Sequence, residues 1–319
     1  MSRLESVQVN RSAIAPERPA WQLALLALRM PLFLSVLCLL ALMRFGFLVF
    51  HTLAEGISII ISVTALVVAS TSLRFTRNHF AVFIAIAIGW CAGLDFIHLM
   101  VYKGMNLLPV DNGASTQYWI AARYIQAVGL LLAPLALRRP VKIRWLHLGF
   151  GGAVTAAALL ISSGRFPVTY IEGSGLTLFK ELSEYVIIGM MAIALLLYRE
   201  NRGLMSDRLY LGMSAAVGLM ILAEFSFSTY MDLYGVGNRI GHLLKIVAYW
   251  YVYLALVRST LSEPFTMLAR AASTYDAVPD PALMITDTGV IPAGQRRCRR
   301  AGGHSRRATG RRIRACALP

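Results

Sequence analysis

Pairs of ionisable residues recur inside the hydrophobic segments of this 319-residue chain, at spacings of three or four residues. These pairs are His51 with Glu55, Asp95 with His98, and His242 with Lys245. Residues at such spacings share one face of a helix. Imidazole and carboxylate groups together suit a divalent metal ion, whereas basic side chains suit an organic anion. The pairs therefore predict a polar binding site built by several helices, and the class of its ligand stays open between these two.

The composition decides what kind of element carries these pairs. Hydrophobic residues make up 57% of the chain and charged residues only 15%, which is far from the soluble globular average. A bilayer core of about 30 Å needs about 20 apolar residues per helical crossing. The sequence thus predicts an all-α polytopic membrane protein, a bundle of about eight transmembrane helices with a short cytoplasmic C-terminal extension. The expected spans are 24–43, 50–72, 80–101, 117–137, 145–163, 179–198, 208–230 and 238–257.

Basic residues in the short connections predict the orientation. Alternate connections are rich in them, and these hold Arg74 and Arg77, then Arg138, Arg139, Lys142 and Arg144, then Arg199, Arg202 and Arg208, and finally Arg258. Loops rich in Arg and Lys stay on the cytoplasmic side. With an even number of spans, both termini are expected in the cytoplasm.

Given this orientation, the ionisable residues of the spans form one layer in the outer third of the membrane. The candidate ligand-binding residues are His51, Glu55, Asp95, His98, Arg123, Glu184, Glu224, His242 and Lys245. Four of them are also candidate ligands of a divalent metal ion, the one cofactor considered: His51, Glu55, His98 and His242. Charged groups at this depth are costly and normally face a bundle interior or a cavity. Two alternatives stay open: ion pairs that fix helix register, such as Glu224 with Lys245 or Glu184 with Arg123, and histidines hydrogen-bonded between helices.

Four motifs resemble a known family. They are FHTLAEGISIIISV at 50–63, LDFIHLMVYKGM at 94–105, ARYIQAVGLLLAP at 122–134 and AEFSFSTYMDLYGVGNRIGHLLKIVAYWYVYLALV at 223–257. In this order they are similar to the third class of bacterial membrane-associated sensor domains, the MASE family, over about residues 25–265. The resemblance implies the N-terminal part of a sensor diguanylate cyclase or sensor histidine kinase in the bacterial inner membrane.

The sequence changes character after the last span. The segment YDAVPDPALMITDTGVI, from Tyr275, is similar to the opening of a PAS domain, which is expected to be truncated because the rest lacks a core-forming composition. After Ile291 come nine arginines and no acidic residue. Two interpretations stay open: a frameshifted end, or a disordered basic tail that contacts anionic lipid. The expected parts are a cytoplasmic segment 1–22, a sensor domain 23–260, a connecting helix 261–274, a truncated PAS-like start 275–291 and a basic tail 292–319.

Three classes of function compete for this pattern. We expect a signal-sensing domain that binds a small extracellular or periplasmic ligand or metal ion within the lipid bilayer and passes the signal to a cytoplasmic PAS and GGDEF or histidine-kinase output, missing in this chain. The alternative is a small-solute or ion transporter, which would need polar groups through the midplane. An intramembrane enzyme is disfavoured because no catalytic motif is present. A homodimer is a candidate assembly, and no nucleic-acid partner is expected.

Overall fold

The computed structural model describes residues 20–72, 78–105, 107–108, 113–171, 174–228, 235–257 and 259, without the side chains of 20–28 and 30. Its long helices are α1 (Ala20–Leu42), α2 (Phe47–Ser72), α3 (His79–Met100), α4 (Ala114–Leu132), α6 (Ile143–Ser162), α7 (Leu178–Glu200), α8 (Asp207–Ser228) and α9 (Val236–Val257). The short elements are the 3₁₀ turns η2 (Met43–Phe45) and η3 (Arg202–Leu204), the helical turn α5 (Leu135–Arg138) and the strands β1 (Tyr170–Ile171) and β2 (Gly175–Leu176).

Each of the eight predicted spans contains most of one long helix, and the all-α membrane fold is confirmed. Seven helices among the described residues are long and apolar enough to cross a membrane: α2, α3, α4 with α5, α6, α7, α8 and α9. The described side chains of α1 support a shorter apolar stretch, Pro31–Phe45, so its crossing stays a prediction. The fourth span bends at Ala133 and Pro134, where α4 ends and α5 begins, because proline cannot donate the next helical hydrogen bond.

Helix α3 lies at the centre of the bundle, where it packs against α2, α4, α6 and α9. Before Asp95 its sequence is apolar on nearly all sides, and 78% of its most hydrophobic window is buried, as expected for a helix surrounded by protein. Gly129 of α4 allows a close approach to α3, since a Cβ atom there would lie 2.6 Å from the Cβ of Ala87. The central position of α3 brings its polar end against three other helices.

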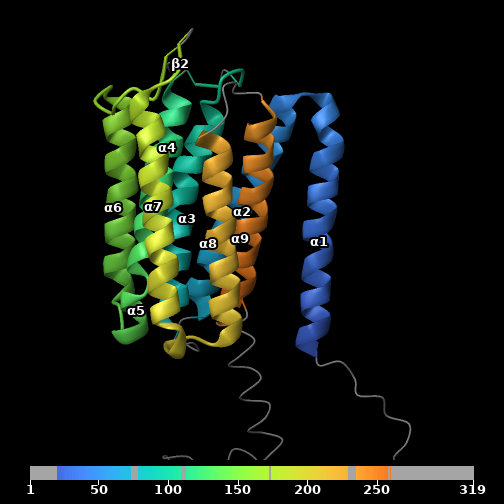
Figure 1. The fold of residues 1–319 in the computed structure, drawn as a ribbon, viewed down its shortest axis with the longest axis vertical. Coiled ribbons are helices and arrows are strands. Elements are labelled where there is room, and N and C mark those ends of the chain that lie inside the picture. The colour runs from blue at the N-terminus through green and yellow to red at the C-terminus, as the bar shows by residue number, and fades with distance from the viewer. Residues whose placement is uncertain are drawn as a thin grey trace, which may run out of the picture. The chain divides into compact units, whose positions relative to one another are not determined.

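The helices run alternately up and down, so the end of α3 meets the starts of α2, α4 and α9 (Figure 1). In this view α1, in blue, stands at one side of the bundle. Large apolar side chains point outward, among them Ile60, Leu148 and Leu211, each more than 60% exposed. Such a surface suits contact with lipid tails. The antiparallel pair of β1 and β2 lies at the end of the bundle where α3 finishes (Figure 1).

The expected connecting helix, PAS-like start and basic tail lie outside the described residues, as does most of the N-terminal segment.

Candidate functional site

Each of the nine candidate ligand-binding residues is at least 95% buried in the bundle. Two of these residues lie further along their helices than the predicted spans implied. Arg123 lies nine residues from the start of α4 and Lys245 nine residues from the start of α9, or about 14 Å at 1.5 Å per residue, because both helices begin before the predicted spans. The outer-third position in the membrane stays a prediction.

The inner part of the layer is a paired network around Arg123. Its Nη2 atom donates to both carboxylate oxygens of Asp95, at 2.6 and 2.7 Å. Its Nη1 atom donates to the Tyr249 hydroxyl at 2.8 Å and to the Gln126 side-chain oxygen. The Tyr249 hydroxyl donates to that same oxygen at 3.1 Å. The guanidinium carbon also lies 4.7 Å from the ring centroid of Trp119. The hydrogen bonds of Arg123 to Asp95 and Tyr249 thus join α4 to α3 and α9.

Glu55 and Lys245 join α2 to α9 beside this network. The Nζ atom of Lys245 donates to both Glu55 oxygens, at 2.9 and 2.7 Å, and lies 3.6 Å from Oδ2 of Asp95. It also lies 4.5 Å from the Trp119 ring centroid. The Nδ1 atom of His242 lies 2.9 Å from Oε1 of Glu55, but it is not aligned for a hydrogen bond. The ammonium group therefore stands between two carboxylates, closer to Glu55.

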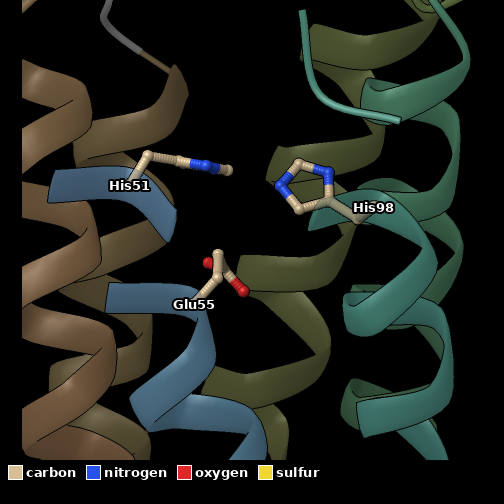
Figure 2. A group of neighbouring side chains, drawn as sticks. All are labelled: His51, Glu55 and His98. Carbon is tan, nitrogen blue, oxygen red and sulfur yellow. The ribbon is translucent and has the colours of Figure 1, made fainter. Parts of the chain in front are cut away.

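Three histidines form the outer part of the layer. The ring centroid of His51 lies 5.4 Å from that of His98 and 4.8 Å from that of His242, and its ring stacks on Tyr102 at 3.7 Å. Figure 2 shows His51 and Glu55 of α2 facing His98 of α3 across one space. Donor atoms of these three residues lie within 4.8 Å of one another. The three rings thus lie together, as the sequence predicted.

These histidines are poorly satisfied as hydrogen-bonding groups. Both ring nitrogens of His51 and the Nε2 atom of His98 are buried without a hydrogen-bond partner in the described structure. The Nδ1 atom of His98 does have partners, namely the carbonyl oxygen of Ser115 at 2.8 Å and its hydroxyl at 3.0 Å. Buried polar groups are rarely left unpaired in native structures. We therefore expect a ligand or a water molecule to contact the unpaired nitrogens.

A small cavity of about 20 Å³ adjoins the histidines, with room for about one water molecule or ion. It is lined by His98, Tyr102, Thr116, Trp119, Phe227, Asn238 and His242. Because Thr116 and Asn238 belong to the first turns of α4 and α9, the cavity lies toward the end of the bundle where these helices begin.

A family model matches residues 42–264, which are most of the chain. The model, named MASE3, describes a membrane-associated sensor domain. The chain belongs to the MASE3 family. No curated protein and no solved structure matches the chain. The resemblance expected from the four motifs is confirmed, and the matched residues contain the whole polar layer. The chain is therefore a multi-pass membrane protein that carries a sensor domain.

The polar layer also contains a separate ion pair, Lys180 with Glu184 on α7. Their charged atoms lie 2.6 Å apart, and Nζ of Lys180 donates to the carbonyl oxygen of Phe227 at 2.8 Å. Glu224 of α8 is 97% buried, and its Oε2 atom has no hydrogen-bond partner among the described residues. The structure thus brings His51, Glu55, Asp95, His98, Arg123, His242 and Lys245 into one connected group. It places Glu184 in a different ion pair from the predicted one.

Both ion pairs considered from the sequence are replaced. Lys245 pairs with Glu55 rather than Glu224, and Arg123 pairs with Asp95 rather than Glu184. Carboxylates of α2 and α3 satisfy these two cations because α2 and α3 pack beside α9 and α4. The general expectation of ion pairs between helices is correct, and only the partners differ.

Two residues that hold the polar layer together were absent from the predicted site: Trp119 and Tyr249. A signal for each exists in the sequence. Trp119 precedes Arg123 by four residues and Tyr249 follows Lys245 by four, so each shares a helix face with a predicted residue. A search one helical turn before and after each predicted residue would have found both.

Proposed function

We propose that this MASE3 domain senses a small polar ligand or a metal ion that enters the outer pocket from the periplasmic side. The signal then passes along α9 to a cytoplasmic output of the PAS and GGDEF or histidine-kinase type. The bacterial inner membrane and cytoplasmic termini are part of this proposal, and they rest on the arginine-rich connections.

One observation supports the proposal most directly. The outer pocket, by which we mean His51, His98, His242 and the adjoining cavity, is buried, yet ring nitrogens of its histidines have no hydrogen-bond partner in the described structure. His51 is 0% exposed, yet neither ring nitrogen has a partner among the described residues. A buried polar group without a partner costs about 1–3 kcal/mol. A pocket that keeps such groups beside a cavity is typical of a binding site rather than of a helix interface.

The opposite half of the bundle supports a sensor over a transporter. It contains a large cluster of buried apolar side chains, including Ile84, Leu130, Met213 and Val252. The Tyr198 hydroxyl donates to the Leu130 carbonyl oxygen at 3.0 Å and so joins α7 to α4. A solute path would need polar groups through this region. The polar layer thus faces one end of the bundle.

Labelling of the end of the bundle that holds the pocket tests the orientation. We expect a Ser174→Cys variant, in a background without native cysteines, to react with a membrane-impermeant maleimide in spheroplasts, because Ser174 is exposed between β1 and β2. The matched control is Glu200→Cys, exposed at the opposite end of α7, which should react only in inverted vesicles. The reverse pattern would refute the periplasmic entry.

Ligand binding and transport can be separated with the purified chain. Metal ions and small organic anions are tested for a rise in melting temperature in wild type and in His51→Ala. A sensor predicts at least one compound that stabilises wild type but not the variant, and no uptake of that compound into proteoliposomes. Uptake that requires His51 would favour the transporter instead.

A further inference from the structure

The Nε2 atom of His98 is oriented as a metal ligand. A carbonyl oxygen can only accept a hydrogen bond, so the 2.8 Å contact of Nδ1 with the Ser115 carbonyl places the hydrogen on Nδ1. The lone pair is then on Nε2, which is buried and has no partner in the described structure. A histidine that donates one ring N–H to a backbone carbonyl and offers the other nitrogen is the usual arrangement in protein metal sites.

His51 offers a second nitrogen donor. Its ring is held between Tyr102 and the other two histidines, and neither nitrogen is hydrogen-bonded in the described structure. Either nitrogen can therefore present a lone pair without breaking a contact. The cost of the buried, unpaired ring is relieved when a metal ion binds to it.

Glu55 adds a carboxylate oxygen beside these nitrogens. The donor atoms of His51, Glu55 and His98 lie within 4.8 Å of one another and face the same space in Figure 2. Donors around a tetrahedral zinc ion lie about 3.4 Å apart, given bonds of about 2.0–2.2 Å. Side-chain rotations that bring the donors up to about 1.4 Å closer therefore complete the site. His242, whose Nδ1 lies 2.9 Å from Glu55, is positioned as the fourth ligand.

From this geometry we infer that His51, Glu55, His98 and His242 bind a divalent first-row transition metal ion such as Zn²⁺. The inference rests on the proposed function, because it names the ligand class of the same pocket. Imidazole donors favour such ions over Mg²⁺ and Ca²⁺, which prefer oxygen ligands. The two cations beside the site are already paired, Lys245 with Glu55 and Arg123 with Asp95. An organic anion would have to displace a carboxylate from one of them, whereas a metal ion can bind ring nitrogens that have no partner in the described structure.

Lys245 connects the metal site to the inner network. Its ammonium group donates hydrogen bonds to both oxygens of Glu55 and lies 3.6 Å from Oδ2 of Asp95. A metal ion that takes an oxygen of Glu55 displaces the ammonium group, which then moves toward Asp95, the partner of Arg123. Because Lys245 belongs to α9, this exchange converts metal binding into a change at the helix that leads to the cytoplasmic side.

Competition between Lys245 and a metal ion for Glu55 predicts how the affinity changes when Lys245 is replaced. Loss of the Lys245 charge should tighten binding of a cation at Glu55, whereas it should weaken binding of an anion. The experiment titrates Zn²⁺ into the full chain in nanodiscs against a chromophoric chelator. Co²⁺ absorption in the visible region then reports the coordination geometry. The variants are His51→Ala, His98→Ala and Lys245→Met, with His79→Ala as control, because His79 lies at the far end of α3.

We expect wild type and His79→Ala to bind one ion with the same affinity. His51→Ala and His98→Ala should each lose more than about 100-fold, beyond the effect typical of outer-shell partners. Lys245→Met should bind at least as tightly as wild type. If Lys245→Met does not fold, the two histidine variants and the cobalt spectrum still decide the question.

Other results overturn the inference. Zinc binding that survives both histidine substitutions would place the metal elsewhere in the chain. If wild type binds no Zn²⁺ but an organic anion stabilises it in a Lys245-dependent way, the metal inference fails while the proposed sensor stands. If no compound binds and Ser174→Cys is unreactive from the periplasmic side, the proposed function fails as well.

Discussion

The two parts of the buried layer satisfy their polar groups to very different degrees. In the inner network, Asp95, Arg123, Gln126 and Tyr249 share several hydrogen bonds of 3.1 Å or less. In the outer pocket, His51 has no hydrogen bond in the described structure, and His98 uses one of its two nitrogens. Both parts are equally removed from solvent, so burial alone does not explain the difference.

The difference separates two roles for polar residues in a membrane. A buried ion pair with several hydrogen bonds fixes the register of neighbouring helices, and removal of one partner leaves a costly charge. Within the inner network, only the Nε atom of Arg123 has no partner among the described residues. A buried imidazole without hydrogen bonds lowers the free energy of unfolding instead, because its polar nitrogens have lost their contact with water. The inner network is therefore expected to govern stability and the outer pocket to govern binding.

The largest effect on stability is expected from Arg123→Met. The substitution leaves Asp95 buried without its main partner, and such a loss costs about 3–5 kcal/mol. The measurement is the free energy of unfolding during titration with SDS in mixed micelles. The matched control is Arg202→Met, because Arg202 and its partner Asp207 are 60% and 79% exposed and such surface pairs contribute about 0–1 kcal/mol. Equal effects of the two substitutions would contradict the structural role of the inner network.

The sequence predicted the positions of helices and of the polar layer, because both depend on one-dimensional signals. Eight apolar stretches of bilayer length mark the helices, and each ionisable residue inside them marks the layer. The start of the helix that carries Arg123 was placed too late, because α4 begins at Ala114, three residues before the predicted span. Polar residues such as Ser115 and Thr116 in its first turn weaken the hydrophobic signal there.

The partners within the layer were not predictable in the same way. Glu55 and Lys245 are 190 residues apart in sequence, and their contact depends on which helices are neighbours and how each is rotated. Packing decides both, for example the close approach of α3 and α4 at Gly129. The contribution of Tyr249 was hidden because aromatic residues are common in membrane helices and carry no unique signal.

A medium effect is expected from Tyr249→Phe, which removes one acceptor for Arg123 and one donor to Gln126. Arg123 keeps its carboxylate partner, so the loss should be smaller than for Arg123→Met. Hydrogen bonds between membrane helices contribute about 0.6 kcal/mol on average and up to about 1.7 kcal/mol, and we expect a loss in this range. The control is Tyr185→Phe, since Tyr185 is 55% exposed. A loss as large as that of Arg123→Met would mean that the hydroxyl, not the ion pair, holds the network together.

The smallest effect on stability is expected from His51→Leu, although His51 is 0% exposed. Most substitutions at fully buried positions destabilise a protein. Here the substitution replaces a ring with two unpaired nitrogens by an apolar side chain, and removing an unsatisfied buried group is nearly neutral or stabilising. Without added metal, the free energy of unfolding should stay within about 1 kcal/mol of wild type or rise.

Zinc should reveal what this residue contributes. A ligand at 100 times its dissociation constant stabilises the folded state by about 2.7 kcal/mol, so wild type should gain about this amount and His51→Leu should not. His98→Leu is the informative comparison, because it also loses the hydrogen bond to Ser115 and should be less stable than His51→Leu even without metal. If His51→Leu instead loses as much stability as Arg123→Met, the outer pocket is structural. The contrast between the two parts of the layer would then disappear, because both would serve to hold the helices together.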